Sequence, residues 1–283
     1  MGTGQDVFER LEKKYVLDRS QREGVMEALA CSHRIDAYGT ATVTSLYFDT
    51  DRRSLIERSL EKPLYKEKLR LRAYGASEGA RMLRAFGIPG GRRPLAAADR
   101  ALPVFLEMKK KYAGVVYKRR MALPLQAARA FLGGMPWEEV RSLACWASFA
   151  DPLGQSPARS TQIAREIGAL MERRGPLSPS AAIACERTAL EPAEDADARR
   201  GQLRVTFDEG IRALDMRQAD AGWFPVLGSG AQLMEVKNRG PLDTVFARVL
   251  SQEKLYPQSF SKYGRAHRLM QGRMAGGRGE RCA

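Results

Sequence analysis

Cationic side chains alternate with other residues along the stretch "YKEKLRLRAYG", residues 65–75, and this spacing constrains the fold more than any other feature. Lys66, Lys68, Arg70 and Arg72 occupy every second position. In a β-strand such positions lie on one face. Four like charges on one face repel one another, and like charges opposite each other on neighbouring strands add to that cost. The pattern therefore predicts a strand that faces an anionic ligand.

The alternation recurs in other predicted strands. Its polar positions are Arg10, Glu12, Lys14, Glu107, Lys109, Lys111, Arg187, Arg204, Thr206, Asp208, Glu235 and Lys237, with a further cluster at Lys118–Arg120. The opposite faces carry Leu69, Leu71, Leu106, Met108, Val205, Phe207, Met234 and Val236. A sheet whose polar face is open to solvent is one interpretation. A barrel, with its apolar face under helices and its charged face lining a tunnel, explains the repeated cations better.

The predicted fold class is α+β, an antiparallel eight-stranded β tunnel with flanking helices. The predicted strands are 7–17, 41–50, 65–74, 104–112, 115–124, 180–190, 203–215 and 231–240. Helices are expected after an Asp18 cap and at 51–61, 125–174 and 241–270, with a loop or poorly ordered insertion at 75–103. The chain shows no regular alternation of strands and helices, which argues against a doubly wound parallel sheet. One domain is expected over 5–272, with a helical insertion at about 125–175 and a disordered basic tail at 273–283.

The overall charge also indicates an anionic partner. The chain has 283 residues and a formal net charge of +14. Nucleic acid is the less favoured partner, because the cations are not interleaved with base-stacking aromatic residues and because carboxylates share their faces. Four dispersed cysteines and no apolar leader segment favour the cytoplasm. No apolar run is long enough for a membrane span. The sequence leaves open whether the protein has a membrane partner and what its oligomeric state is.

Eight motifs, "RLEKKY", "SLYFDT", "KLRLRAYG", "FLEMKKK", "CERTAL", "RVTFDEGI", "MEVKNRG" and "FSKY", occur in this order from about residue 8 to 264. Together they resemble the VTC (vacuolar transporter chaperone) polyphosphate polymerase domain of the triphosphate tunnel metalloenzyme, or CYTH-like, superfamily. The resemblance implies a tunnel that binds triphosphate and polyphosphate. It also implies transfer of the ATP γ-phosphate to a growing polyphosphate chain with Mn²⁺ or Mg²⁺.

The resemblance assigns roles residue by residue. The residues expected to grip phosphates and stabilise the transition state are Arg70, Arg72, Arg187, Arg204 and Lys109. Those expected to bind substrate along the tunnel are Arg10, Lys14, Lys68, Lys111, Lys118, Lys237 and Lys262. The expected metal ligand is Glu235, together with Glu12, Glu107 or Asp208. For the last three residues, an ion pair with a neighbouring Lys or Arg is the alternative to metal binding.

Two positions depart from the pattern of the superfamily. Its first-strand signature E-x-E-x-K reads Arg10-x-Glu12-x-Lys14 here, which favours polymerase members over triphosphatases and adenylate cyclases and removes one carboxylate. Cys185 stands where many members have tyrosine. A triphosphatase and a non-catalytic polyphosphate sensor remain alternatives to the polymerase.

Several residues outside the tunnel faces are predicted to have structural rather than ligand-binding roles. Asp49 is expected to cap a turn or helix, and His33 and His267 are expected on the surface. Trp137 and Trp146 are expected to pack within the helical insertion rather than to form a nucleotide pocket.

Overall fold

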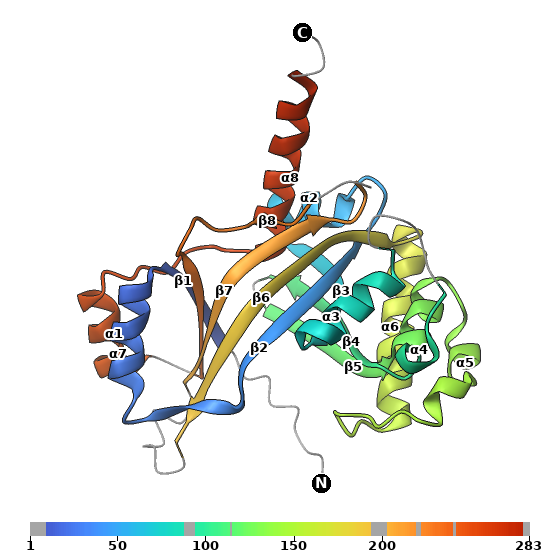
Figure 1. Ribbon diagram of the computed structural model, residues 1–283, viewed down its shortest axis with the longest axis horizontal. Helices are drawn as coiled ribbons and strands as arrows, with labels where there is room; N and C mark the ends of the chain where they lie inside the picture. The colour runs from blue at the N-terminus through green and yellow to red at the C-terminus, as the bar shows by residue number, and fades with distance from the viewer. Residues whose placement is uncertain are drawn as a thin grey trace. The chain divides into compact units, whose positions relative to one another are not determined.

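The computed structural model describes residues 10–87, 94–113, 115–193, 203–218, 222–239 and 242–279. Its strands form one sheet in the order β1-β9-β7-β6-β2-β3-β4-β5, and a short strand β8 pairs with β7 (Figure 1). Within those ranges no strand pairing joins β1 to β5, so the sheet is not closed by hydrogen bonds. The fold is α+β, an antiparallel sheet with flanking helices, as the alternating pattern predicts.

Most bounds follow the predicted strands, but β2 begins at His33 rather than at residue 41, and β8 was not predicted. The strands are β1 (Arg10–Leu17), β2 (His33–Asp49), β3 (Tyr65–Tyr74), β4 (Pro103–Tyr112), β5 (Val115–Pro124), β6 (Ser178–Pro192), β7 (Arg204–Asp215), β8 (Phe224–Pro225) and β9 (Gln232–Arg239). The α-helices are α1 (Arg19–Leu29), α2 (Ser54–Leu60), α3 (Ala76–Ala85), α4 (Leu125–Leu132), α5 (Trp137–Val140), α6 (Pro157–Arg174), α7 (Thr244–Gln252) and α8 (Lys262–Gly279). Two 3₁₀ turns, η1 (Ala97–Asp99) and η2 (Ala144–Trp146), complete the set.

The chain divides into two compact units. The first unit comprises Met1–Ala41, Cys185–Ile211 and Leu227–Phe260, and the second comprises Thr42–Ala184, Arg212–Val226 and Ser261–Ala283. Strands β2, β6 and β7 each pass from one unit into the other. The prediction of one tunnel domain over 5–272 stays a prediction.

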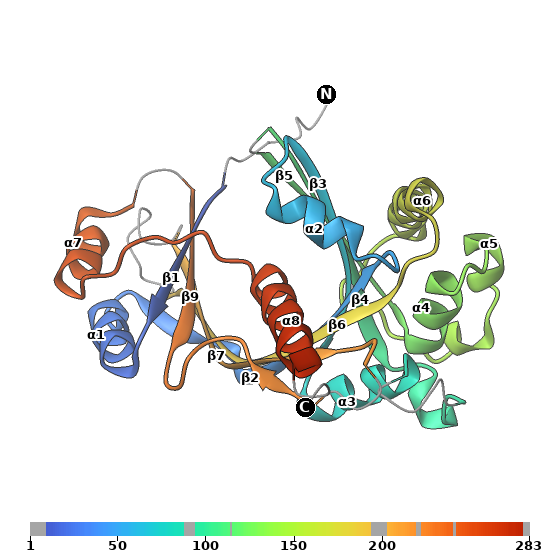
Figure 2. The same cartoon turned by 90° about the horizontal axis from the view of Figure 1, so that it is seen from above.

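The first unit has its own apolar core. Tyr15 of β1, Phe207 of β7 and Met234 of β9 are buried together with Val25 of α1 and Phe246 of α7. Helices α1 and α7 lie side by side (Figure 2). Asp18 caps α1 by accepting the backbone N–H of Gln21, whose side chain returns the bond, so the predicted capping box is present.

The core of the second unit contains the apolar faces of β3, β4 and β5. Leu69, Leu71, Leu106 and Met108 are fully buried there. Helices α4 and α6 supply further members of this core (Figure 2), and Trp137 packs among them, as expected for the helical insertion. Because the apolar positions of these strands point to the helices, their charged positions lie on the opposite face.

Four expectations from the sequence are wrong. Residues 75–87 and 94–103 contain α3 and η1 rather than only a loop, because Gly79, Met82 and Leu83 are spaced to bury one face of a helix; residues 88–93 lie outside the described part. The predicted disordered tail, 273–283, is helical as far as Gly279, because α8 continues into it from a first half that is partly buried. Residues 280–283 lie outside the described part. His33 and His267 are buried, and His33 contacts the Ser32 hydroxyl and the Leu203 carbonyl.

A buried polar network joins β2, α2 and α8 within the second unit. The Asp49 carboxylate accepts the backbone N–H groups of Leu55 and Ile56 at 2.9 and 3.0 Å, which confirms its capping role. The Tyr263 hydroxyl donates to Asp49 and contacts the Ser180 hydroxyl, both at 2.9 Å. Burial and the negative charge of Asp49 raise the pKa of Tyr263, so this phenol stays protonated and keeps its donor.

We expect Asp49→Ala to lower the free energy of unfolding by about 3 kcal/mol, because it leaves buried N–H donors and the Tyr263 hydroxyl without an acceptor. Denaturant titration measures the loss. Asp51→Ala is the matched control, since Asp51 is exposed and its carboxylate accepts from the Ser178 hydroxyl at 3.5 Å without capping α2. Equal losses in the two variants would contradict the proposed importance of the buried network.

Candidate functional site: two charged clusters

The pairing of β3, β4 and β5 places cations directly opposite one another in the second unit. Lys68 pairs with Lys109, and Lys109 pairs in turn with Lys118. Like charges at directly opposed positions destabilise a sheet. This row of three lysines therefore favours a nearby anion, and Lys118 contacts the Glu107 carboxylate at 2.9 Å.

The next row along the same strands is built around a carboxylate, Glu107, which pairs with Arg70 on one side and Arg120 on the other. The Arg70 guanidinium donates to Glu107 through Nε at 2.7 Å and lies 2.6 Å away through Nη2. Lys118 Nζ lies 2.9 Å and Arg120 Nε 3.4 Å from the other carboxylate oxygen, and Arg72 is within 3.9 Å. Arg70, Arg72, Glu107, Lys118 and Arg120 are called the Glu107 cluster below.

The Glu107 cluster carries a surplus of positive charge. Within the described ranges, Glu107 is the only carboxylate that pairs with its four cations. Burial raises the pKa of Glu107, but Arg70, Arg72 and Lys118 outweigh burial and hold that pKa well below its usual range. Burial lowers the pKa of Lys118, and the attraction to Glu107 does not fully offset it. The cluster therefore suits a ligand with several negative charges.

Sequence reasoning missed Arg120 and the aromatic residues that position this cluster. The register settles the ambiguity at Lys118–Arg120: Lys118 and Arg120 share the face of Glu107, while Arg119 pairs with Glu166 on the opposite face. The alternation of the strand was the signal that could have found Arg120.

Aromatic rings fix the guanidinium groups. The Tyr47 hydroxyl accepts from Arg70 at 3.1 Å, and the Tyr263 ring stacks on Tyr47 with ring centroids 4.4 Å apart. Arg120 lies 4.2 Å above the centre of the Phe105 ring. Burial raises the pKa of Tyr47, but Arg70 and the nearby lysine and arginine charges lower it overall. These contacts hold the arginines in place before a ligand binds.

We expect Glu107→Gln to lower the free energy of unfolding by about 3 kcal/mol at pH 7 and low salt, because it leaves four cations without a counter-charge. The pKa of Glu107 is lower in the folded protein than its ordinary value of 4.5. Its contribution is therefore present above that value and is lost as the pH falls through the folded pKa. The difference between wild type and variant should shrink below pH 4.5, which denaturant titrations across this range measure.

Added tripolyphosphate should restore stability to Glu107→Gln more than to the wild type, since it supplies the missing negative charge. Glu166→Gln is the control, because Glu166 pairs with Lys110 and Arg119 on the opposite face. Equal recovery in both variants would show a general salt effect and would contradict anion binding at the Glu107 cluster.

The first unit contains a second charged cluster, on β1 and β9. Lys14 Nζ lies 3.2 Å from Glu12 and 3.3 Å from Glu235, and Lys237 Nζ lies 3.6 Å from the other oxygen of Glu235. Burial lowers the pKa of Lys14, but Glu235 and Glu12 outweigh it and raise that pKa overall. Glu12, Lys14, Glu235 and Lys237 are called the Glu235 cluster below.

Arg187 and Asp208 form a buried ion pair on the neighbouring strands β6 and β7. The guanidinium donates two bonds to the carboxylate, at 2.6 and 2.7 Å, and the Cys185 thiol donates to the same carboxylate at 3.6 Å. Burial lowers the pKa of Arg187, but Asp208 outweighs it and keeps the side chain charged. The Asp208 carboxylate is thus engaged by the Arg187 guanidinium.

The remaining predicted residues are less engaged with these clusters. Arg204 is exposed and lies 3.8 Å from Asp36, and its strand position is opposite Lys237. Lys111 is exposed and pairs with Lys66 across β3 and β4. Lys262 begins α8, next to Ser261, whose hydroxyl accepts from Lys68 at 2.9 Å. Arg10 begins β1, and its side chain lies outside the described part.

Glu12 and Glu235 are the carboxylates of the Glu235 cluster that could hold a metal ion together with phosphate oxygens, and both pair with Lys14 in this structure. In the described ranges, no three His, Cys, Asp or Glu side chains are grouped so that they could hold a metal by themselves. Glu12 and Glu235 do converge on one point, the Lys14 ammonium. Mg²⁺ in phosphoryl-transfer sites takes one or two carboxylates and completes its shell with phosphate oxygens and water. Two convergent carboxylates match that requirement.

Comparison with known protein families matches residues 9–271 to the VTC domain. The chain belongs to the VTC domain family. This membership supports a function that involves polyphosphate or triphosphate. It also supports a role as a phosphate-transfer enzyme. A comparison with curated proteins finds no match.

Two solved structures are similar to the chain of this VTC domain protein at low identity. One is a protein of Vibrio parahaemolyticus provisionally named an adenylate cyclase, with 10% identity, a TM-score of 0.42, and coverage of 91% of this chain and 97% of that chain. The other is the Schizosaccharomyces pombe Mediator head module, with 9% identity, a TM-score of 0.34, and coverage of 87% and 90%. No helix in the described part of the chain is both long and apolar enough to cross a membrane.

Proposed function

We propose that this VTC domain protein is a metal-dependent polyphosphate polymerase that transfers the γ-phosphate of ATP to a growing polyphosphate chain. The observation that supports it most is the surplus of cations on one face of β3, β4 and β5. There Lys68 and Lys109 adjoin the four cations that share the single carboxylate of Glu107, one of which is Lys118. An elongated polyanion neutralises such a surface better than a compact one.

In this proposal the arginines bind and orient phosphate. Arg70 and Arg72 grip phosphoryl oxygens with their planar forks and stabilise the charge that develops during transfer. Tyr47 keeps the Arg70 guanidinium in one orientation. Lys14, Lys68, Lys109, Lys111, Lys118 and Lys237 neutralise further charge, and Arg187 and Arg204 are assigned to phosphate oxygens as well.

Glu235 and Glu12 are proposed to hold Mn²⁺ or Mg²⁺ through their carboxylate oxygens. When bound, the metal would neutralise negative charge on phosphate oxygens at this cluster. Glu107 and Asp208 are better described as counter-ions, because Arg70 and Lys118 occupy Glu107 and Arg187 occupies Asp208.

A transfer to phosphate needs little proton chemistry from the protein. The terminal phosphate of polyphosphate is already anionic at neutral pH, so it can attack without a general base. Hydrolysis, in contrast, has to activate water. Glu107 is a poor base for that task, because the surrounding cations hold its pKa well below the usual range. This argues against Glu107 as the general base of a triphosphatase reaction.

The direct test is to incubate the purified protein with ATP, Mn²⁺ and a short polyphosphate primer. The products are separated on a gel stained for polyphosphate, while ADP and free phosphate are assayed. We expect a ladder of polymer with release of ADP. Free phosphate without polymer would replace the proposal by a triphosphatase, and tight polyphosphate binding without turnover would replace it by a sensor.

A further inference from the structure

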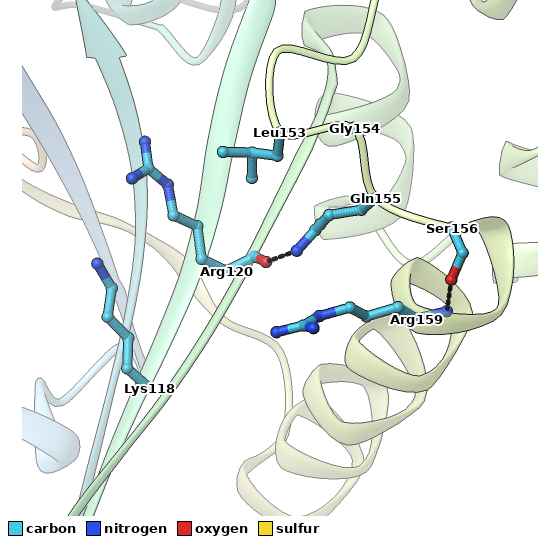
Figure 3. Close-up of a pocket in the computed structure, with 7 residues that line it drawn as sticks. All are labelled: Lys118, Arg120, Leu153, Gly154, Gln155, Ser156 and Arg159. Atoms are coloured by element: carbon cyan, nitrogen blue, oxygen red, sulfur yellow. Dashed lines mark hydrogen bonds between the residues drawn. The ribbon is translucent and has the colours of Figure 1, made fainter. Parts of the chain in front are cut away.

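A basic cavity of about 500 Å³ lies in the second unit, beside the last strand of the sheet order. Lys118 and Arg120 of β5 line one side, and Arg159 of α6 lines the other. The Lys118 and Arg120 side chains extend away from Arg159 (Figure 3), and both contact Glu107. Leu153, Gly154, Gln155 and Ser156, from the loop before α6, complete the wall. The Gln155 side chain donates to the Arg120 carbonyl at 2.9 Å, which ties this loop to β5.

The cavity shares two residues with the Glu107 cluster. Lys118 and Arg120 line the cavity and also contact Glu107, at 2.9 and 3.4 Å. Arg159 adds a further cation, for which the described residues provide no carboxylate partner within ion-pair distance. The positive surplus of the Glu107 cluster therefore extends into the cavity.

The lining suits phosphate rather than a nucleobase. Two guanidinium groups and one ammonium group are the side chains that bind phosphate oxygens. A base would require an aromatic face for stacking, whereas the largest apolar side chain in the lining is that of Leu153. The N-terminus of α6 contributes few free N–H donors for a phosphate. Pro157 has no N–H, and the Ser156 hydroxyl already accepts the N–H of Arg159 at 3.4 Å. The side-chain cations carry the argument.

We infer that this cavity is an additional phosphate subsite for long polyphosphate chains, which continue from the Glu107 cluster past Lys118 and Arg120 to Arg159. The inference rests on the proposed function and adds a dependence on chain length. A triphosphate held at the Glu107 cluster does not engage Arg159, whereas phosphates further along a polymer do.

The experiment compares binding of tripolyphosphate and of a long polyphosphate of defined length to full-length wild type and Arg159→Gln, by calorimetry. We expect Arg159→Gln to weaken binding of the long chain roughly fivefold, as for the loss of one partly exposed ion pair. Binding of tripolyphosphate should not change. The slope of the logarithm of long-chain affinity against the logarithm of salt concentration should fall in magnitude by about one.

Arg165→Gln is the matched control. It removes the same charge from the same helix, and Arg165 is exposed like Arg159, but it lines a different cavity with Arg141. Arg159→Lys should retain most of the affinity for the long chain, because it keeps the charge. Equal weakening by Arg159→Gln and Arg165→Gln would overturn the subsite, as would unchanged long-chain binding in Arg159→Gln. If wild type fails to bind even tripolyphosphate, the proposed function itself fails instead.

Discussion

Glu235→Gln is expected to reduce metal-dependent ATP turnover roughly a thousandfold, which corresponds to a rise of about 4 kcal/mol in the activation free energy. Triphosphate binding should stay measurable. The amide keeps the shape of the side chain but loses the charge that would bind Mn²⁺. Lys14 still pairs with Glu12 in the variant, so the cluster is not left without a counter-charge. Steady-state assays across a range of Mn²⁺ concentrations measure the effect.

The same variant separates a metal ligand from a simple counter-ion. If Glu235 only balances Lys14 and Lys237, its loss should change stability and substrate affinity but leave the dependence on Mn²⁺ as it was. Glu209→Gln is the control, because Glu209 lies on the same unit and pairs with Arg22 at 3.6 Å. Retained turnover in Glu235→Gln would remove Glu235 from the metal role.

The strand period made the faces of the sheet predictable. A residue two positions along a strand returns to the same face, so the burial of Leu69 and Leu71 and the opposite placement of Arg70 and Arg72 follow from spacing alone. The pairing between strands did not follow, because a shift of one residue reverses every side chain and the sequence does not fix the register. The convergence of Lys118 and Arg120 on Glu107 therefore emerged only in the structure.

Contacts between residues distant in sequence were also out of reach. Tyr47 and Tyr263 stack within the second unit, although more than two hundred residues separate them, and periodicity carries no information on such a pair. His33 was misplaced for a related reason, since its partners include the distant Leu203 carbonyl. Helix α3 was missed because the Gly, Pro and Ala residues of 75–103 obscured the short apolar face of residues 76–85.

Replacement of Arg70 by Gln is expected to lower turnover by roughly a hundredfold to a thousandfold, the range for removing one preorganised charge donor from a transition state. Arg70 is the best-positioned cation of the Glu107 cluster. Its guanidinium makes two contacts below 3 Å with Glu107 and donates to Tyr47. A group held in this way needs no reorganisation when phosphate binds, which is the condition for a large catalytic contribution. Single-turnover rates at saturating ATP measure the loss.

Arg70→Lys tests whether the planar fork matters beyond its charge. Lysine keeps the positive charge but cannot make the paired contacts with Glu107 and the bond to Tyr47 together. We therefore expect it to recover tripolyphosphate affinity much better than turnover. Arg119→Gln controls for net charge, because Arg119 pairs with Glu166 on the opposite face of β5. If Arg119→Gln slowed turnover as much as Arg70→Gln, the effect would come from the overall field of a basic protein, and the specific role of Arg70 would be rejected.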